Sequence, residues 1–166
     1  KYDYIASISA KCTESFLKIF PDLKDKIVEI SNINAEQLIR QQAKENDAED
    51  MTTQEDEICL CSIGRFAHAK NFDHIPSIAK KIKEKGIKFK WFIIGYGGEE
   101  QLIREKIKEE NMEDIVIILG KKDNPYPYIK KCDIYIQPSR YEGKAVTVIE
   151  AQMLKKPVII TAFPSS

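Results

Sequence analysis

The sequence predicts an α/β protein built on a Rossmann-like, doubly wound parallel sheet, preceded by the remnant of a second α/β domain. After residue 56, five short apolar runs typical of strands alternate with amphipathic segments of helical length. Strands separated by helices pair in parallel, and right-handed crossovers place the helices on both faces of the sheet. Ligands of such sheets bind outside the carboxyl ends of the strands, so the loops after the strands are the expected functional region.

Residues 1–46 give two strand–helix units, and residues 47–56 are acidic, polar and aperiodic, which indicates a linker. The elements expected before the linker are strands at 2–8 and 26–31 and helices at 10–21 and 34–45, with Pro21 ending the first helix and Asn32 or Asn34 capping the second.

Residues 57–166 contain the regular strand–helix alternation. The expected strands are 57–64, 88–95, 114–120, 132–138 and 157–161, and 57–64, 132–138 and 157–161 are expected to be buried. The expected helices are 74–86, with Ile75, Ile78, Ala79 and Ile82 on one apolar face, 96–112 after a glycine turn, a short helix within 121–131, and 144–154.

Composition excludes several classes of protein. The 26 basic and 26 acidic residues cancel, which removes the general argument for binding nucleic acid or an anionic membrane. No apolar run reaches the roughly 20 residues of a transmembrane helix.

The expected location is cytoplasmic, with a membrane-peripheral position of the full-length protein as the alternative. Lys1 at the start and a strand close to the end indicate a piece of a longer protein.

The four cysteines, Cys12, Cys59, Cys61 and Cys132, form no C-x-x-C pair. A zinc site is therefore not expected, and the cysteines are interpreted as small apolar residues in a reducing compartment.

The loop after the first strand of this region carries two cations, Arg65 and Lys70, beside the turn at Gly64. Arginine can bind two phosphate oxygens at once and lysine adds a point charge, so the pair suits a diphosphate. The alternative is that both are solvated surface cations. A helix beginning near Lys144 would turn backbone N–H groups and its positive dipole end toward the same anion.

Two acids, Glu142 and Glu150, lie eight residues apart, which corresponds to ~12 Å along a helix. Paired-carboxylate hydrolases need about 5–9.5 Å, so the spacing instead suits two contacts along one extended ligand. The alternative for Glu150 is a solvated helix residue. His68 and His74 are interpreted as solvated, and the glycine run at 95–98 lacks the third glycine of a dinucleotide fingerprint.

Four segments in order, GRFAHAKN, FIIGYGGEE, ILGKKDN and CDIYIQPSRYEGKAVTVIEAQMLKKPVIIT, resemble the retaining glycosyltransferases of the GT4 type, which have the GT-B fold. The resemblance spans about 57–163 and identifies 57–166 as the nucleotide-sugar donor-binding domain, truncated at its C-terminus. Residues 1–46 resemble the last strand–helix units of that family's N-terminal acceptor domain.

The resemblance implies a role for each matching residue. Arg65 and Lys70 would bind the diphosphate, Glu142 the donor sugar, and Glu150 the ribose. The remaining positions implied to contact the donor are Gly64 in the first loop, Gly120 and Lys121 at the base, and the backbone of Gly143, Lys144, Ala145 and Val146 at phosphate and sugar. Arg65, Lys70 and Glu142 would be the catalytic residues.

The reaction implied is transfer of a sugar, with retention, from a UDP- or GDP-sugar to an acceptor hydroxyl, without a metal or other cofactor. The partners implied are the nucleotide-sugar and a glycan or lipid-linked acceptor held by the remainder of the N-terminal domain. That domain also carries a catalytic His or Asp in many relatives, so the fragment alone is expected to bind nucleotide weakly and to be inactive.

Two departures from the family pattern are visible: EGKAVT stands where many relatives have Glu-Gly-Phe-Gly, and Lys155 stands where many have Gly. The alternatives are a non-catalytic nucleotide-sugar-binding module and a sugar-nucleotide epimerase of the same fold. A receiver-like signalling domain is disfavoured because Ser62, Gly64 and Arg65 occupy the place of its acidic residues.

Overall fold

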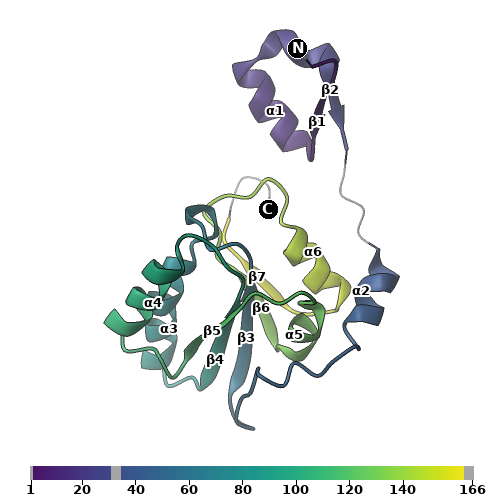
Figure 1. Cartoon of the computed structure of the whole chain (residues 1–166). Coiled ribbons are helices and arrows are strands. Elements are labelled where there is room, and N and C mark those ends of the chain that lie inside the picture. Colours follow the sequence, from purple (N-terminus) through teal and green to yellow (C-terminus); the bar gives the residue numbers. More distant parts are fainter. Residues whose placement is uncertain (1, 31–34, 163–166) are drawn as a thin grey trace.

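The computed structural model describes residues 2–30 and 35–162, which form a small unit with two strands and a larger unit with five strands (Figure 1). In the small unit, β1 (Ile5–Ser7) pairs in parallel with β2 (Ile27–Glu29). Between them lie α1 (Ala10–Ile19) and the 3-10 helix η1 (Pro21–Lys26). Ser9 caps α1 by accepting the N–H of Cys12 at 3.2 Å. Both predicted strands and the helix are present, in shorter form.

The larger unit confirms the predicted fold class. Its five strands are all parallel, in the order β5-β4-β3-β6-β7. Their bounds are β3 Ile58–Ile63, β4 Phe89–Ile94, β5 Val116–Gly120, β6 Ile134–Gln137 and β7 Val158–Ile160. The chain runs outward from β3 through β4 to β5 and then returns to the other side of β3 at β6. The crevice at which such a sheet binds ligands therefore lies between the loops after β3 and β6.

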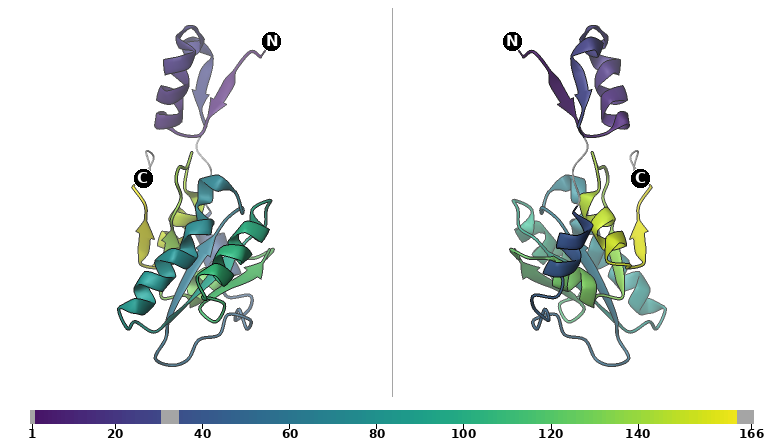
Figure 2. Two further views of the ribbon diagram at one scale, coloured as in Figure 1. Left: turned by 90° about the vertical axis from the view of Figure 1, so that its left-hand side faces the viewer. Right: turned by 90° about the vertical axis from the view of Figure 1, so that its right-hand side faces the viewer.

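Helices cover both faces of the sheet, as Figures 1 and 2 show. The helices α3 (Ile75–Glu84) and α4 (Glu100–Glu109) lie on one face, over a core around Leu60, Trp91 and Ile103. On the other face, α5 (Tyr126–Lys131) and α6 (Val146–Met153) cover a core around Cys61 and Phe92. Leu60 and Cys61 thus belong to opposite faces, because successive side chains of a strand point to opposite sides of the sheet.

On the predicted apolar face of α3, Ile75 and Ala79 are buried, while Ile78 is 36% exposed. One prediction of burial is wrong. The strand β7 is an edge strand and not a buried one, with Ile159 54% and Ile160 38% exposed. An apolar run alone does not distinguish an edge strand from a central one.

The segment 47–56, expected to be a linker, is packed onto the larger unit. Ala48 and Met51 are buried in the core on the α5 and α6 face. Asp50 accepts hydrogen bonds from Lys122 at 2.6 Å and from the Tyr128 hydroxyl at 2.8 Å. The preceding helix α2 (Glu36–Gln42) contacts α5 and α6, although the sequence groups it with residues 1–46. Ala35 precedes α2 without a capping side chain, and the caps predicted at 32 and 34 fall outside the described residues.

A polar contact lies inside the core between neighbouring strands. The buried Ser62 hydroxyl donates to the Ile136 carbonyl at 2.6 Å and accepts the indole N–H of Trp91 at 2.9 Å. Both side-chain polar groups are thus satisfied without water.

Three of the four cysteines, Cys59, Cys61 and Cys132, are buried, Cys12 is partly buried, and all four thiols are unpaired with each other. Burial raises the pKa of the Cys59 thiol to about 12, so this thiol is unreactive at neutral pH. Among the described residues, no helix has the length and apolar character that crossing a bilayer would require.

Candidate functional site

The loops after β3 and β6 meet through an ion pair between two predicted site residues. Lys70 Nζ lies 2.6 Å from Glu142 Oε1, across 72 residues of sequence. The exposed fractions of the two side chains are 22% and 8%, so the pair is largely withdrawn from solvent. A charge-assisted contact at this distance is stronger than a pair fully in water. Lys70 and Glu142 are therefore in contact beyond the carboxyl ends of β3 and β6, at the point where the strand order reverses.

Glu142 is also held by two polar residues that the sequence analysis did not select. Ser139 Oγ donates to Glu142 Oε1 at 2.6 Å, and Gln137 Nε2 donates to the same oxygen at 3.2 Å. Gln137 is fully buried and in turn accepts the Tyr135 hydroxyl at 2.8 Å. Burial raises the pKa of Tyr135, which keeps its phenol protonated as the donor. The sequence feature that could have indicated this role is Gln137 itself, a polar residue at the end of an otherwise apolar strand.

Gly64 lies beside the stem of Lys70. A Cβ at position 64 would be 3.2 Å from Lys70 Cε, so glycine leaves room for the lysine to lie against the backbone. Gly95, at φ +149°, packs even closer: a Cβ there would be 1.9 Å from the Gly64 carbonyl oxygen. These glycines therefore permit the loops after β3 and β4 to touch through their backbones.

Arg65 lines a hollow of about 280 Å³ formed by the loops after β3, β4 and β5. Lys121 and Lys122 line the same hollow together with Tyr96 and Pro125. The ammonium of Lys121 lies 5.9 Å from the centroid of the Tyr96 ring, within the range of a cation–π contact. The structure thus brings two predicted residues, Arg65 and Lys121, to one cationic hollow, which Gly64 also lines.

The helix α6 begins at Val146, two residues later than predicted. Gly143, Lys144 and Ala145 lie in the loop before it, and the Val146 N–H donates to the Lys144 carbonyl at 2.9 Å. The amide of Val146 is therefore engaged within the turn. Gly120 ends β5 at φ +73°, and its carbonyl accepts the N–H of Gly95 at 2.9 Å.

Glu150 lies on α6, half-buried and paired with a tyrosine. The Tyr126 hydroxyl donates to Glu150 Oε1 at 3.0 Å. Burial raises the pKa of Glu150, and the hydrogen bond from Tyr126 partly opposes that rise. Burial together with the charge of Glu150 raises the pKa of Tyr126 to about 12. Glu150 is therefore not a fully solvated helix residue, and Tyr126 is a partner that the sequence analysis missed.

The small unit approaches the same edge of the sheet at one point. Ser9 Oγ and Cys12 Sγ both reach the Gly143 carbonyl, at 3.4 and 3.6 Å. A Cβ at position 143 would be 3.1 Å from Ile8 Cδ1. The loop that carries Glu142 is thus in contact with the small unit.

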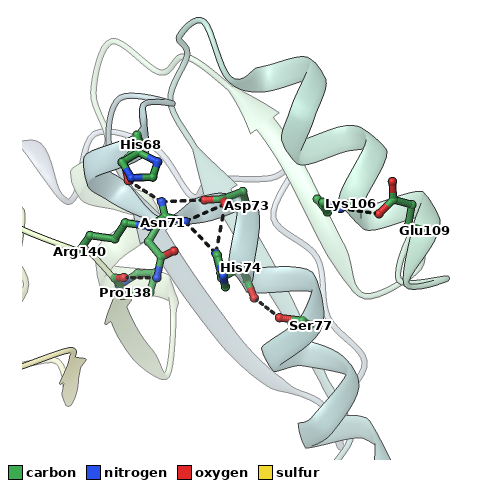
Figure 3. A network of polar contacts seen from close by, with 9 residues as sticks. All are labelled: His68, Asn71, Asp73, His74, Ser77, Lys106, Glu109, Pro138 and Arg140. Atoms are coloured by element: carbon green, nitrogen blue, oxygen red, sulfur yellow. Dashed lines mark hydrogen bonds and ion pairs between the residues drawn. The ribbon is translucent and has the colours of Figure 1, made fainter.

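The structure places neither His68 nor His74 where it could act as a general base for a nucleophile. His74 is exposed, with Nδ1 3.1 Å from Asp73 Oδ2, while His68 contributes its backbone carbonyl to the Arg140 side chain (Figure 3). Within residues 2–30 and 35–162, no three His, Cys, Asp or Glu residues are grouped as metal ligands.

Comparisons with known proteins assign the chain to a family and a fold. The family model described as "Glycosyl transferases group 1" matches residues 43–166. The uncharacterized glycosyltransferase MJ1059 of Methanocaldococcus jannaschii is 29% identical over 153 residues, which are 91% of this chain and 35% of that protein. The amylovoran biosynthesis glycosyltransferase AmsD of Erwinia amylovora is 31% identical over 100 residues, which are 60% of this chain and 28% of that protein.

Among solved structures, Anabaena Alr3699/HepE in complex with UDP and glucose matches with a TM-score of 0.80 at 15% identity. The match covers 97% of this chain and 45% of that one. The chain spans about a third of the length of the two curated relatives.

Proposed function

Because the chain belongs to the glycosyl transferases group 1 family, whose fold is of the GT-B type, we propose that it is the donor-binding portion of a retaining glycosyltransferase. The reaction proposed is transfer of a hexosyl group from a nucleotide-diphosphate sugar, UDP- or GDP-linked, to an acceptor hydroxyl. HepE, which shares the fold, was crystallised with UDP and glucose, and this supports a donor of that class.

The observation that carries the proposal is the contact of Lys70 with Glu142 at 2.6 Å between the loops after β3 and β6. Cation and acid lie together at the place where parallel sheets bind ligands, and Arg65 lines the adjoining hollow. An anionic leaving group with a polar sugar needs this combination: cations for phosphate oxygens and a carboxylate that accepts sugar hydroxyls.

In the proposed mechanism, Arg65 and Lys70 stabilise the negative charge that develops on the leaving diphosphate. This is electrostatic catalysis by preorganised groups, and it is strongest in a site withdrawn from water. Glu142, fixed by Ser139 and Gln137, orients the sugar. Glu150 accepts the ribose hydroxyls, while the Tyr126 hydroxyl donates to its Oε1. No resident cofactor is part of the proposal.

The acceptor is proposed to be a glycan or a lipid-linked glycan, bound by parts of a longer protein outside these residues. The name of AmsD, an amylovoran biosynthesis enzyme, supports polysaccharide assembly as the setting. The full-length protein would act in the cytoplasm, with the membrane periphery as the alternative location.

Calorimetric titration with UDP, uridine and a panel of UDP-, GDP- and ADP-sugars tests the proposal. Arg65→Ala should weaken UDP binding by tenfold or more, because a hydrogen bond to a charged group contributes about 1.5–3 kcal/mol. Uridine binding should not change. The matched control is Arg104→Ala, since Arg104 is an exposed arginine on α4 paired with Glu100.

Equal affinity of the unmodified chain for uridine and UDP would contradict the phosphate-binding role. Conversion of the sugar nucleotide without any acceptor would instead favour an epimerase.

A further inference from the structure

The loops after β3 and β6 are tied together by a second ion pair next to the first, between Asp73 and Arg140 (Figure 3). We propose that Asp73 and Arg140 are positioning residues, whose bidentate contact sets the two loops in the register that brings Lys70 against Glu142. The inference rests on the proposed function for its consequence in donor binding, while its structural part concerns this chain alone.

The geometry of the pair is that of a strong contact. Arg140 Nη1 and Nη2 lie 3.1 and 2.8 Å from the two carboxylate oxygens of Asp73. The exposed fractions of the two side chains are 23% and 15%, so the pair is mostly withdrawn from solvent. Two parallel hydrogen bonds fix orientation as well as distance, which a single lysine contact cannot do.

The same two loops are also joined by three hydrogen bonds that backbone carbonyls accept, and by a contact of 2.9 Å between Arg140 Nη2 and His74 Nδ1. Arg140 Nη1 donates to the His68 carbonyl at 2.5 Å, and the Arg140 N–H donates to the Ala69 carbonyl at 2.8 Å. Asn71 Nδ2 donates to the Pro138 carbonyl at 2.9 Å. The ties therefore fall on both sides of Lys70 in sequence and end two residues before Glu142.

The backbone between these ties has an unusual conformation that the contacts explain. Asn71 is left-handed, at φ +59° and ψ +27°, between the 3-10 helices η2 (His68–Lys70) and η3 (Phe72–His74). Its buried Oδ1 has no hydrogen-bond partner in the described part of the chain. Asparagine tolerates this region better than most residues, and its amide nitrogen is committed to Pro138.

The protonation state of Asp73 agrees with a permanent ion pair. Burial acts to raise the pKa of Asp73, but the hydrogen bond and charge of Arg140 outweigh it and lower the pKa overall. The carboxylate is therefore charged throughout the neutral range, and the pair persists there.

The test compares binding of UDP and uridine by calorimetry in Asp73→Asn, in Arg140→Gln, and in each combined with Lys70→Ala. Asp73→Asn and Arg140→Gln should each weaken UDP binding by about tenfold, a difference of 1.4 kcal/mol, and leave uridine unchanged. In the Lys70→Ala background neither should weaken UDP further, because their effect acts through Lys70. The control is Lys88→Gln, which breaks the exposed Lys88–Asp56 pair at the opposite end of the sheet, before β4.

Unchanged UDP affinity together with a lower thermal midpoint would make the pair a purely structural tie and overturn the inference. An equal loss of affinity with and without Lys70 would overturn it as well.

A second measurement is independent of any nucleotide. The coupling between Lys70→Met and Glu142→Gln, read from urea unfolding, should be present in the unmodified chain and lost in Asp73→Asn. Coupling that survives Asp73→Asn overturns the positioning role. If the unmodified chain does not distinguish UDP from uridine, the proposed function fails, and the coupling measurement still decides the inference.

Discussion

Glu150 shows how burial and one hydrogen bond act in opposite directions on a single acid. Its pKa lies above the ordinary value of 4.5 because the side chain is partly withdrawn from water. A raised folded-state pKa means that folding favours the protonated form. The contribution of Glu150 to stability is therefore greatest below about pH 4.5 and is lost as pH rises through the folded-state pKa.

Glu150→Gln should for this reason raise the thermal midpoint at pH 7, since the glutamine carries no charge but still accepts the Tyr126 hydroxyl. The difference between variant and unmodified chain should shrink to nothing as the pH falls below about 4.5. Calorimetric scans at several pH values would measure it. Glu113→Gln, at an exposed position, is the control. A lower midpoint for Glu150→Gln at pH 7 would show that the charged form is favoured by the fold.

At the scale of an element, the loop after β4 depends on one glycine more than on its neighbour. A Cβ at Gly97 would be 2.3 Å from the Phe66 carbonyl oxygen and 2.8 Å from the Phe66 nitrogen. Both are backbone atoms that hold this turn, through Phe66 N–H to Tyr96 and Glu99 N–H to Phe66. At Gly98, one residue further, a Cβ would have no atom of the described chain within 4 Å beyond its own neighbours in sequence.

Gly97→Ala should lower the free energy of unfolding by about 2–4 kcal/mol, since the loop must move off the loop after β3. Gly98→Ala should stay within about 0.5 kcal/mol of the unmodified chain. Urea unfolding of the two variants measures both values. Similar stabilities would mean that the two loops separate at little cost.

The segment 47–56 is a second element whose role follows from one side chain. Met51 is 0% exposed, in the core beneath α5 and α6. Met51→Ala should cost about 2–4 kcal/mol, because it removes a buried side chain and leaves a cavity. Thr53→Ala, in the exposed part of the same segment, serves as the comparison. If both variants unfold at the same urea concentration, the segment behaves as a linker after all.

At the scale of the whole molecule, the buried apolar side chains of the described residues lie in the larger unit. Within residues 2–30, no apolar side chain is buried, and both hydrophobic clusters lie beyond residue 47. The contact of the small unit with the larger one described above is made by Ser9 and Cys12 on Gly143.

A chain that begins at residue 35 should therefore unfold cooperatively at a midpoint within a few degrees of the full chain, by thermal scan. The reason is that deletion of 1–34 removes none of the buried apolar side chains of either cluster. A fall of ten degrees or more would show that the small unit stabilises the sheet.

Much of this architecture could be predicted from the sequence, because it depends on local patterns. The strands β3 to β7 were found from runs such as that of Ile58–Ile63, and their parallel order follows from the helices between them. The meeting of Lys70 and Glu142 follows from the rule that loops at the carboxyl ends of strands converge.

The remainder depends on relations that no local pattern contains. Asp73 and Arg140 are 67 residues apart, and they meet only because β6 returns to the side of β3. The burial of Met51 could not be predicted, because the residues around it in sequence are acidic and polar. The pairing of Tyr126 with Glu150 required the relative placement of α5 and α6. Sequence reasoning therefore predicted which loops meet and missed the side chains that hold those loops together.

The indole of Trp91 has a practical consequence. It belongs to the single tryptophan of the chain, it is 1% exposed, and its N–H is bound to Ser62 inside the sheet. Emission excited at its absorption edge would therefore shift to longer wavelength only when the five-stranded core admits water. The small unit contains no tryptophan, so its loss would leave the emission spectrum unchanged. The fluorescence of Trp91 would therefore distinguish unfolding of the larger unit from loss of the small unit.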